Sequence, residues 1–109
     1  MPGGNVRSPD AAFVSNARVP QPLPDDFASV VPDLVVEVLS PSERAGALAA
    51  KIREYFAAGV RLVWVLDPKA RTAAIYRADG PAQALDEEGT LDGEDVLPGF
   101  RCALRDVLD

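Results

Sequence analysis

The chain has 109 residues and a mass of 11.6 kDa, which fits a single domain that we assign to residues 1–109. Its composition, 48% hydrophobic and 26% charged, is that of a globular protein and excludes a disordered tail. The sequence holds no histidine and one cysteine, Cys102. These counts exclude Ser-His-Asp and Cys-His catalysis, histidine-ligated zinc, cysteine-cluster metal sites and an internal disulfide.

The charge balance and the apolar pattern narrow the function further. The formal charge of −6 argues against a broad basic surface for nucleic acid, although carboxylates that hold divalent cations would give the same balance. No apolar run approaches the ~18 residues that a membrane span requires. The first residues lack the apolar core of a signal peptide. We therefore expect a cytoplasmic protein without a membrane partner.

The N-terminal third alternates between turns and strands. Pro2–Asn5 is turn chemistry with no strand before it, which we interpret as a chain that begins in mid-domain. A strand is predicted at Val6–Val14, and a proline-rich loop at Ser15–Pro32. Leu34–Leu39 is a nearly continuous run of leucine and valine, typical of a central strand that is covered on both faces.

The central third predicts one long helix between two strands. Ser40–Glu43 combines a serine cap, a proline at the first helical position and a glutamate three residues after the cap. We expect this helix to reach Ala58 and to end at Gly59. A strand at Val60–Leu66 then follows, and after a turn the chain returns as a strand at Thr72–Arg77.

The last third predicts small pieces at the edge of the sheet. Gln83–Glu94 is expected to form a short edge hairpin around Glu88-Gly89. A short strand at Cys102–Leu104 and a helical turn at Arg105–Leu108 complete the chain. The order of elements predicts an α/β or α+β fold, with one mixed sheet and one main helix after the Glu37 strand.

Glu37 interrupts the apolar central strand and is the most informative residue. A carboxylate at such a position costs several kcal/mol unless it is paired or ligates a cation. Two explanations of the Glu37 carboxylate are therefore open: a salt bridge to a lysine or arginine of the helix, or a metal site. Asp33 lies four residues earlier on the same face, ~13 Å away at about 3.3 Å per residue. The two acids are too far apart to share one ion, and a structural role is favoured for Asp33.

Three further residues are candidates beside Glu37. Asp10 opens a strand that could pair with the Glu37 strand, and neighbouring strands lie about 5 Å apart, close enough for two acids to bind one cation. Pro9-Asp10 is also a common turn signal. Lys51 borders the apolar stripe of the helix, where its stem could simply pack with its head in water. Tyr55 lies one turn further, where packing is the favoured role over a hydrogen bond in a site.

Several residues occur together at a characteristic spacing: Pro32–Ser42, Lys51, Tyr55, Gly59-Val60, Trp64 and Asp67-Pro68. This combination closely resembles the Uma-two family, bacterial proteins similar to restriction endonucleases of the PD-(D/E)xK superfamily. The resemblance extends from Val6 to about Phe100. It implies a restriction-endonuclease-like fold, and metal-dependent hydrolysis of phosphodiester bonds in nucleic acid, with DNA the expected substrate.

The resemblance also implies roles for residues. Asp10 and Glu37 match the two acids that hold Mg²⁺ or Mn²⁺. The superfamily's lysine normally follows the second acid by two residues, but that position is Leu39 here, and Lys51 on the helix takes its place. The expected catalytic residues are thus Asp10, Glu37 and Lys51, with Tyr55 and Asp33 as supporting candidates.

The chain departs from the family pattern in two respects, its length and the residues before the tryptophan. Family members are longer, with a helix, strands and a further acid before the Pro-Gly-Gly turn, so we expect a shortened member. Leu62-Val63 replaces the usual Glu-Tyr before the tryptophan. A strand without its neighbour leaves an edge that favours a homodimer.

Two other functions stay open on the sequence. One is an inactive remnant of the same fold that acts as an interaction module. The other is a metal-independent nucleic-acid binder, which the negative charge disfavours. Metal binding that disappears in Glu37→Ala separates the nuclease from the remnant, and salt-sensitive DNA binding without Mg²⁺ would indicate the metal-independent binder.

Overall fold

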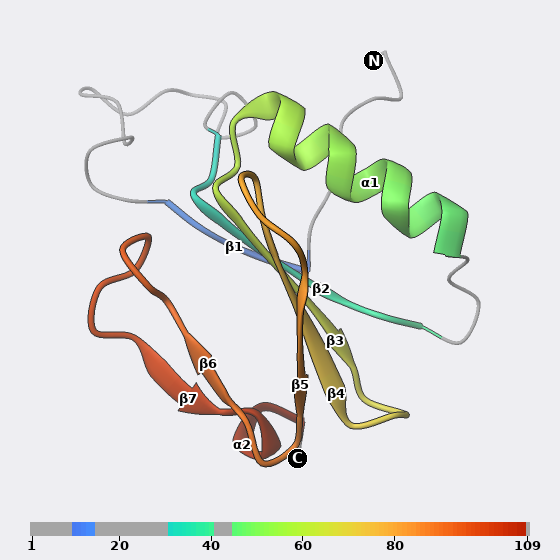
Figure 1. Cartoon of the computed structure of the whole chain (residues 1–109), viewed down its shortest axis with the longest axis vertical. Helices are drawn as coiled ribbons and strands as arrows, with labels where there is room; N and C mark the ends of the chain where they lie inside the picture. Colours follow the sequence, from blue (N-terminus) through green and yellow to red (C-terminus); the bar gives the residue numbers. More distant parts are fainter. Residues whose placement is uncertain (1–9, 15–30, 41–44, 109) are drawn as a thin grey trace.

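The structure, a computed structural model, describes residues 10–14, 31–40 and 45–108. Its main element is a five-stranded sheet with helix α1 (Ala45–Ala58) across one face (Figure 1). The strands follow one another across the sheet in chain order. They are β1 (Ala11–Phe13), β2 (Leu34–Val38), β3 (Leu62–Asp67), β4 (Thr72–Arg77) and β5 (Gln83–Asp86).

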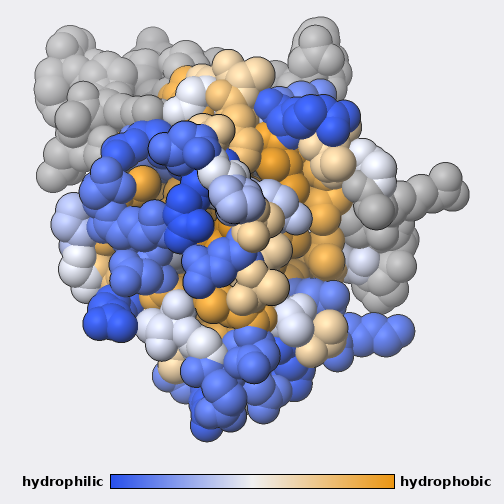
Figure 2. All heavy atoms as spheres, in the orientation of Figure 1, coloured by the Kyte–Doolittle hydropathy of each residue, from blue (hydrophilic) through white to orange (hydrophobic). Residues whose placement is uncertain are grey.

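A second, smaller sheet follows the first along the chain. It consists of the antiparallel strands β6 (Thr90–Asp92) and β7 (Arg101–Ala103), and β7 continues into α2 (Leu104–Leu108). On the face drawn in Figure 2, hydrophilic side chains gather at the left and bottom, while apolar side chains show in the centre and towards α1. Within the described ranges, the helices are too short or too polar to cross a bilayer.

The path of the chain through β2, α1 and β3 fixes where α1 lies. Strands β2 and β3 are parallel, with Glu37 opposite Val65, while the other neighbouring pairs of the main sheet are antiparallel. Two parallel neighbours need a long crossover, and α1 supplies it. The helix therefore packs directly over the strand that carries Glu37.

Side chains of the main sheet alternate between two apolar clusters. The cluster beneath α1 contains Val35, Ile52, Tyr55, Val60, Val63 and Val65. The cluster on the opposite face joins the main sheet to the second sheet and α2, and contains Leu34, Leu62, Trp64, Leu66, Ala73, Ile75, Leu91, Val96 and Leu104. Both faces of β2 and β3 are thus covered, as their continuous apolar sequences predict.

The end of α1 is confirmed at Gly59. This residue has φ of +109°, in the left-handed region that favours glycine. The Gly59 N–H donates to the carbonyl of Phe56 and the Val60 N–H to the carbonyl of Tyr55, at 3.1 and 3.0 Å. These two bonds form a Schellman motif, which reverses the chain towards β3.

Strand ends differ from the sequence prediction for local reasons. Strand β3 begins at Leu62 and not at Val60, because the Val60 N–H caps α1. The final strand and the final helix each begin one residue earlier than expected, at Arg101 and at Leu104. The expected Val6–Val14 strand is found at Ala11–Phe13. Its earlier part, the loop at 15–30 and the helix start at 41–44 lie outside the described residues.

The predicted edge hairpin over Gln83–Glu94 is wrong. Strand β5 pairs with β4 in the main sheet, whereas β6 pairs with β7 in the second one. Leu85 of β5 packs against the apolar cluster that joins the two sheets. Leu91 of β6 is buried in the same cluster from the side of the second sheet. Burial of both leucines on opposite sides of one core separates the two strands, an effect of tertiary packing that local turn signals do not encode.

We predict that Leu104→Ala destabilises the fold by about 2–5 kcal/mol, since it leaves a cavity where the second sheet meets the first. Leu104 is fully buried, and its N–H donates to the carbonyl of Gly89 at 3.0 Å. Urea unfolding followed by the fluorescence of Trp64 measures the change. Val107→Ala, at an exposed position of the same helix, is the control and should cost less than about 0.5 kcal/mol. Equal effects of the two variants would contradict this packing.

Candidate metal centre

The Glu37 carboxylate is buried beneath α1, with the residue 4% exposed. One of its oxygens, Oε1, accepts from the Lys51 ammonium at 3.0 Å. The other, Oε2, accepts from the Tyr55 hydroxyl at 2.8 Å. The buried negative charge is thus paired with a cation and hydrogen-bonded on both oxygens, as its burial requires.

Helix α1 provides both partners of Glu37 from adjacent turns. Lys51 and Tyr55 are four residues apart, so their side chains lie on the same face of the helix. Ile52, three residues before Tyr55, is buried with it in the cluster beneath α1, which holds the helix against the sheet. The sequence favoured a packing role for Tyr55, and the structure adds a hydrogen bond to Glu37. The four-residue spacing from Lys51 is the signal for it.

Asp10 reaches the same end of β2 from the neighbouring strand. In the antiparallel register Ala11 lies opposite Val36, and one further step places Asp10 opposite Glu37. Directly opposed residues of antiparallel strands share a face of the sheet. Asp10 is exposed, and its Oδ2 accepts from the Val38 N–H at 2.6 Å. The expected pairing of the Asp10 and Glu37 strands is therefore found.

Asp33 belongs to a separate network at the other end of β2. Its carboxylate is buried and lies 3.8 Å from Arg61 Nη1, while its carbonyl accepts from the N–H groups of Arg61 and Leu62. Arg61 also pairs with Asp95 at 3.3 Å. Asp33 thus joins the starts of β2 and β3, away from Glu37. The sequence did not single out Arg61, although it is the charged residue in the otherwise apolar run Val60–Leu66.

The donor set at Asp10 and Glu37 fits a hard divalent cation. Among the described residues, no group of three or more histidine, cysteine, aspartate or glutamate side chains gathers to hold a metal. Mg²⁺ retains several waters and is commonly held by one or two carboxylates together with substrate phosphates. Each Glu37 oxygen has a further lone pair beside its hydrogen bond. The two carboxylates therefore suit Mg²⁺ or Mn²⁺, and not a closed zinc site.

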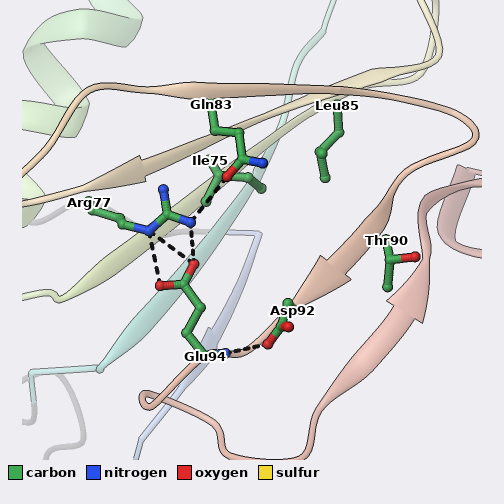
Figure 3. A pocket seen from close by; sticks show the side chains of 7 residues that line it. All are labelled: Ile75, Arg77, Gln83, Leu85, Thr90, Asp92 and Glu94. Atoms are coloured by element: carbon green, nitrogen blue, oxygen red, sulfur yellow. Dashed lines mark hydrogen bonds and ion pairs between the residues drawn. The ribbon is translucent and has the colours of Figure 1, made fainter.

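A second polar cluster lies on the opposite face of the main sheet (Figure 3). Arg77 Nε donates to both Glu94 oxygens, at 2.9 and 3.0 Å, and Nη2 donates to Gln83. The hydrogen bonds that Arg77 donates to the Glu94 carboxylate raise the pKa of Arg77 above its ordinary value. These residues line a cavity of about 270 Å³. Since Arg77 lies opposite Leu62, in the cluster away from α1, this cavity is separate from Glu37.

Comparison with known proteins identifies the family. The sequence matches the Uma2 family model, described as "Putative restriction endonuclease", over residues 1–105. The chain belongs to the Uma2 family. No curated protein matches it.

A solved structure confirms the fold. It is described as a "putative nuclease belonging to DUF820 from Anabaena variabilis" and superposes on the Uma2 chain with a TM-score of 0.76 at 18% sequence identity. The match covers 94% of this chain and 59% of that one, so the chain spans less than two thirds of its structural relative. The expected restriction-endonuclease-like fold, with a mixed sheet and one main helix, is confirmed.

We predict that Lys51→Met destabilises this Uma2 chain by about 1–3 kcal/mol, because the buried Glu37 charge loses its cation. Adding Glu37→Gln should recover part of the loss, since the charge is then removed as well. Chemical denaturation of the two single variants and the double variant measures this coupling. Lys69→Met, at an exposed turn position, is the matched control. Additive effects of the two substitutions would contradict the ion pair.

Proposed function

We propose that this Uma2 chain is a metal-dependent endonuclease domain that hydrolyses phosphodiester bonds, with DNA as its substrate. The observation that carries the proposal is the buried Glu37 carboxylate, which is paired with Lys51 and lies beside Asp10 on the next strand. The description of the family and that of the solved relative both name nucleases, which supports the same chemistry.

The residues divide the work according to their charge and exposure. Asp10 and Glu37 would hold Mg²⁺ or Mn²⁺, which polarises a scissile phosphate and lowers the pKa of a water. Asp10 is exposed, so this end of the sheet is open to a substrate. The Lys51 ammonium, half-buried beside Glu37, would balance the negative charge that develops on the phosphate. Asp33, bound to Arg61, would support the sheet and not the reaction.

The proposal also covers how the domain attracts nucleic acid, whether it self-associates, and its cellular location. A net charge of −6 disfavours tight binding to nucleic acid by bulk charge, so the metal and Lys51 would provide the local attraction. Strand β1 lies at the end of the described sheet and its three residues are exposed. We propose that two copies of the chain associate along this edge. We also propose that the protein acts in the cytoplasm.

The proposal predicts cleavage of plasmid DNA by the 109-residue chain with Mg²⁺ or Mn²⁺. Glu37→Gln and Lys51→Ala should each reduce the rate by at least about 100-fold, because each removes a charge that acts on the transition state. Asp10→Asn tests the second acid, since its amide oxygen can still accept from the Val38 N–H while the ligand charge is lost. Gel analysis of linear and nicked products measures the rates.

The matched control is Lys69→Ala, which removes the charge of an exposed lysine and should leave the rate unchanged. All variants are purified identically, so that a contaminating nuclease would appear in each of them. Cleavage that survives both EDTA and Glu37→Gln would overturn the proposal. Absence of cleavage on DNA and RNA, together with absence of metal binding, would favour an inactive remnant of the fold.

A further inference from the structure

We propose that Tyr55 is a positioning residue, whose hydroxyl holds the Glu37 carboxylate in the orientation that binds the metal. The inference rests on the proposed function and adds a residue to it. Tyr55 would not contact the substrate or the metal itself. It would act through Oε2 of Glu37, to which its hydroxyl donates at 2.8 Å in a buried hydrogen bond.

The surroundings of Tyr55 make it a fixed point. The residue is 7% exposed and packs in the cluster beneath α1 with Ile52 and Val63. Its carbonyl accepts from the Val60 N–H in the Schellman motif that ends the helix. An aromatic ring has few rotamers, and here both the ring and its backbone are held by packing and hydrogen bonds. The direction of the hydroxyl is therefore set by the fold.

Lys51, the other partner of Glu37, is more exposed than Tyr55 and its side chain is less restricted. Its side chain is 19% exposed and has four rotatable bonds to its ammonium. It can turn towards an incoming phosphate while Tyr55 keeps its hydrogen bond. The carboxylate would then remain oriented by Tyr55, with Oε1 directed towards the side from which Lys51 approaches.

Groups that hydrogen-bond a metal ligand commonly contribute 10–100-fold to metal affinity, because they fix the ligand's orientation. Tyr55→Phe removes the hydroxyl and keeps the ring. It therefore separates a positioning role of Tyr55 from a packing role, and packing is the role that the sequence alone favoured. Tyr76→Phe is the matched control, because Tyr76 packs on the same cluster beneath α1 and has no assigned part in the site.

The test is a titration of the full 109-residue chain with Mn²⁺, in which the free ion is measured by electron paramagnetic resonance. We expect Tyr55→Phe to raise the Kd for Mn²⁺ at least about 10-fold, and Glu37→Gln to abolish the site. Tyr76→Phe should bind as the wild type does. Circular dichroism of each variant confirms that the chain is folded at the temperature of the titration.

The outcomes separate the two proposals. Wild-type affinity in Tyr55→Phe, together with a site that Glu37→Gln abolishes, overturns the role of Tyr55 and leaves the metal centre standing. A wild-type chain without any Mn²⁺ site that depends on Glu37 overturns both. Equal weakening in Tyr55→Phe and Tyr76→Phe assigns the effect to general packing and also overturns the role of Tyr55.

Discussion

The buried charge of Glu37 is the constraint on which this structure depends. A carboxylate on an apolar central strand, next to Val65, requires compensation that the sheet itself cannot supply. The crossover helix meets this need by placing Lys51 and Tyr55 on its buried face, four residues apart. The interactions that allow Glu37 to be buried also concentrate a carboxylate, an ammonium group and a hydroxyl at one end of β2. Stability and the candidate chemistry therefore share the same three side chains.

The two faces of the main sheet have different tasks. The face beneath α1 carries the candidate metal centre, whereas the opposite face is covered by the second sheet and α2. The polar groups on that opposite face, Arg77 and Glu94, already satisfy each other. Substitutions there are expected to alter stability and to leave Glu37 in place. Asp33 and Arg61 add a third element, because they join β2 to β3 at the end away from the site.

Much of this arrangement could be predicted from the sequence because its signals are local. The apolar run around Glu37 and the glycine after α1 identify the central strands and the helix end, whereas Lys51 was linked to Glu37 only by the resemblance to the Uma-two family. The predicted hairpin over Gln83–Glu94 failed, since packing of Leu85 and Leu91 from different sheets decides the pairing. The bond from Tyr55 to Glu37 depends on how α1 sits over β2. Sequence spacing permits it but does not require it.

The central claim is that Asp10 and Glu37 together hold a divalent cation. The most direct measurement is X-ray diffraction from crystals of the chain grown with Mn²⁺, with data collected near the manganese absorption edge. The account predicts an anomalous peak between the two carboxylates, with at least one oxygen of each at about 2.0–2.3 Å from it, the range of oxygen ligands to such ions. An ordered Glu37 still paired with Lys51, and no peak at saturating Mn²⁺, would contradict it and leave the ion pair as a purely structural feature.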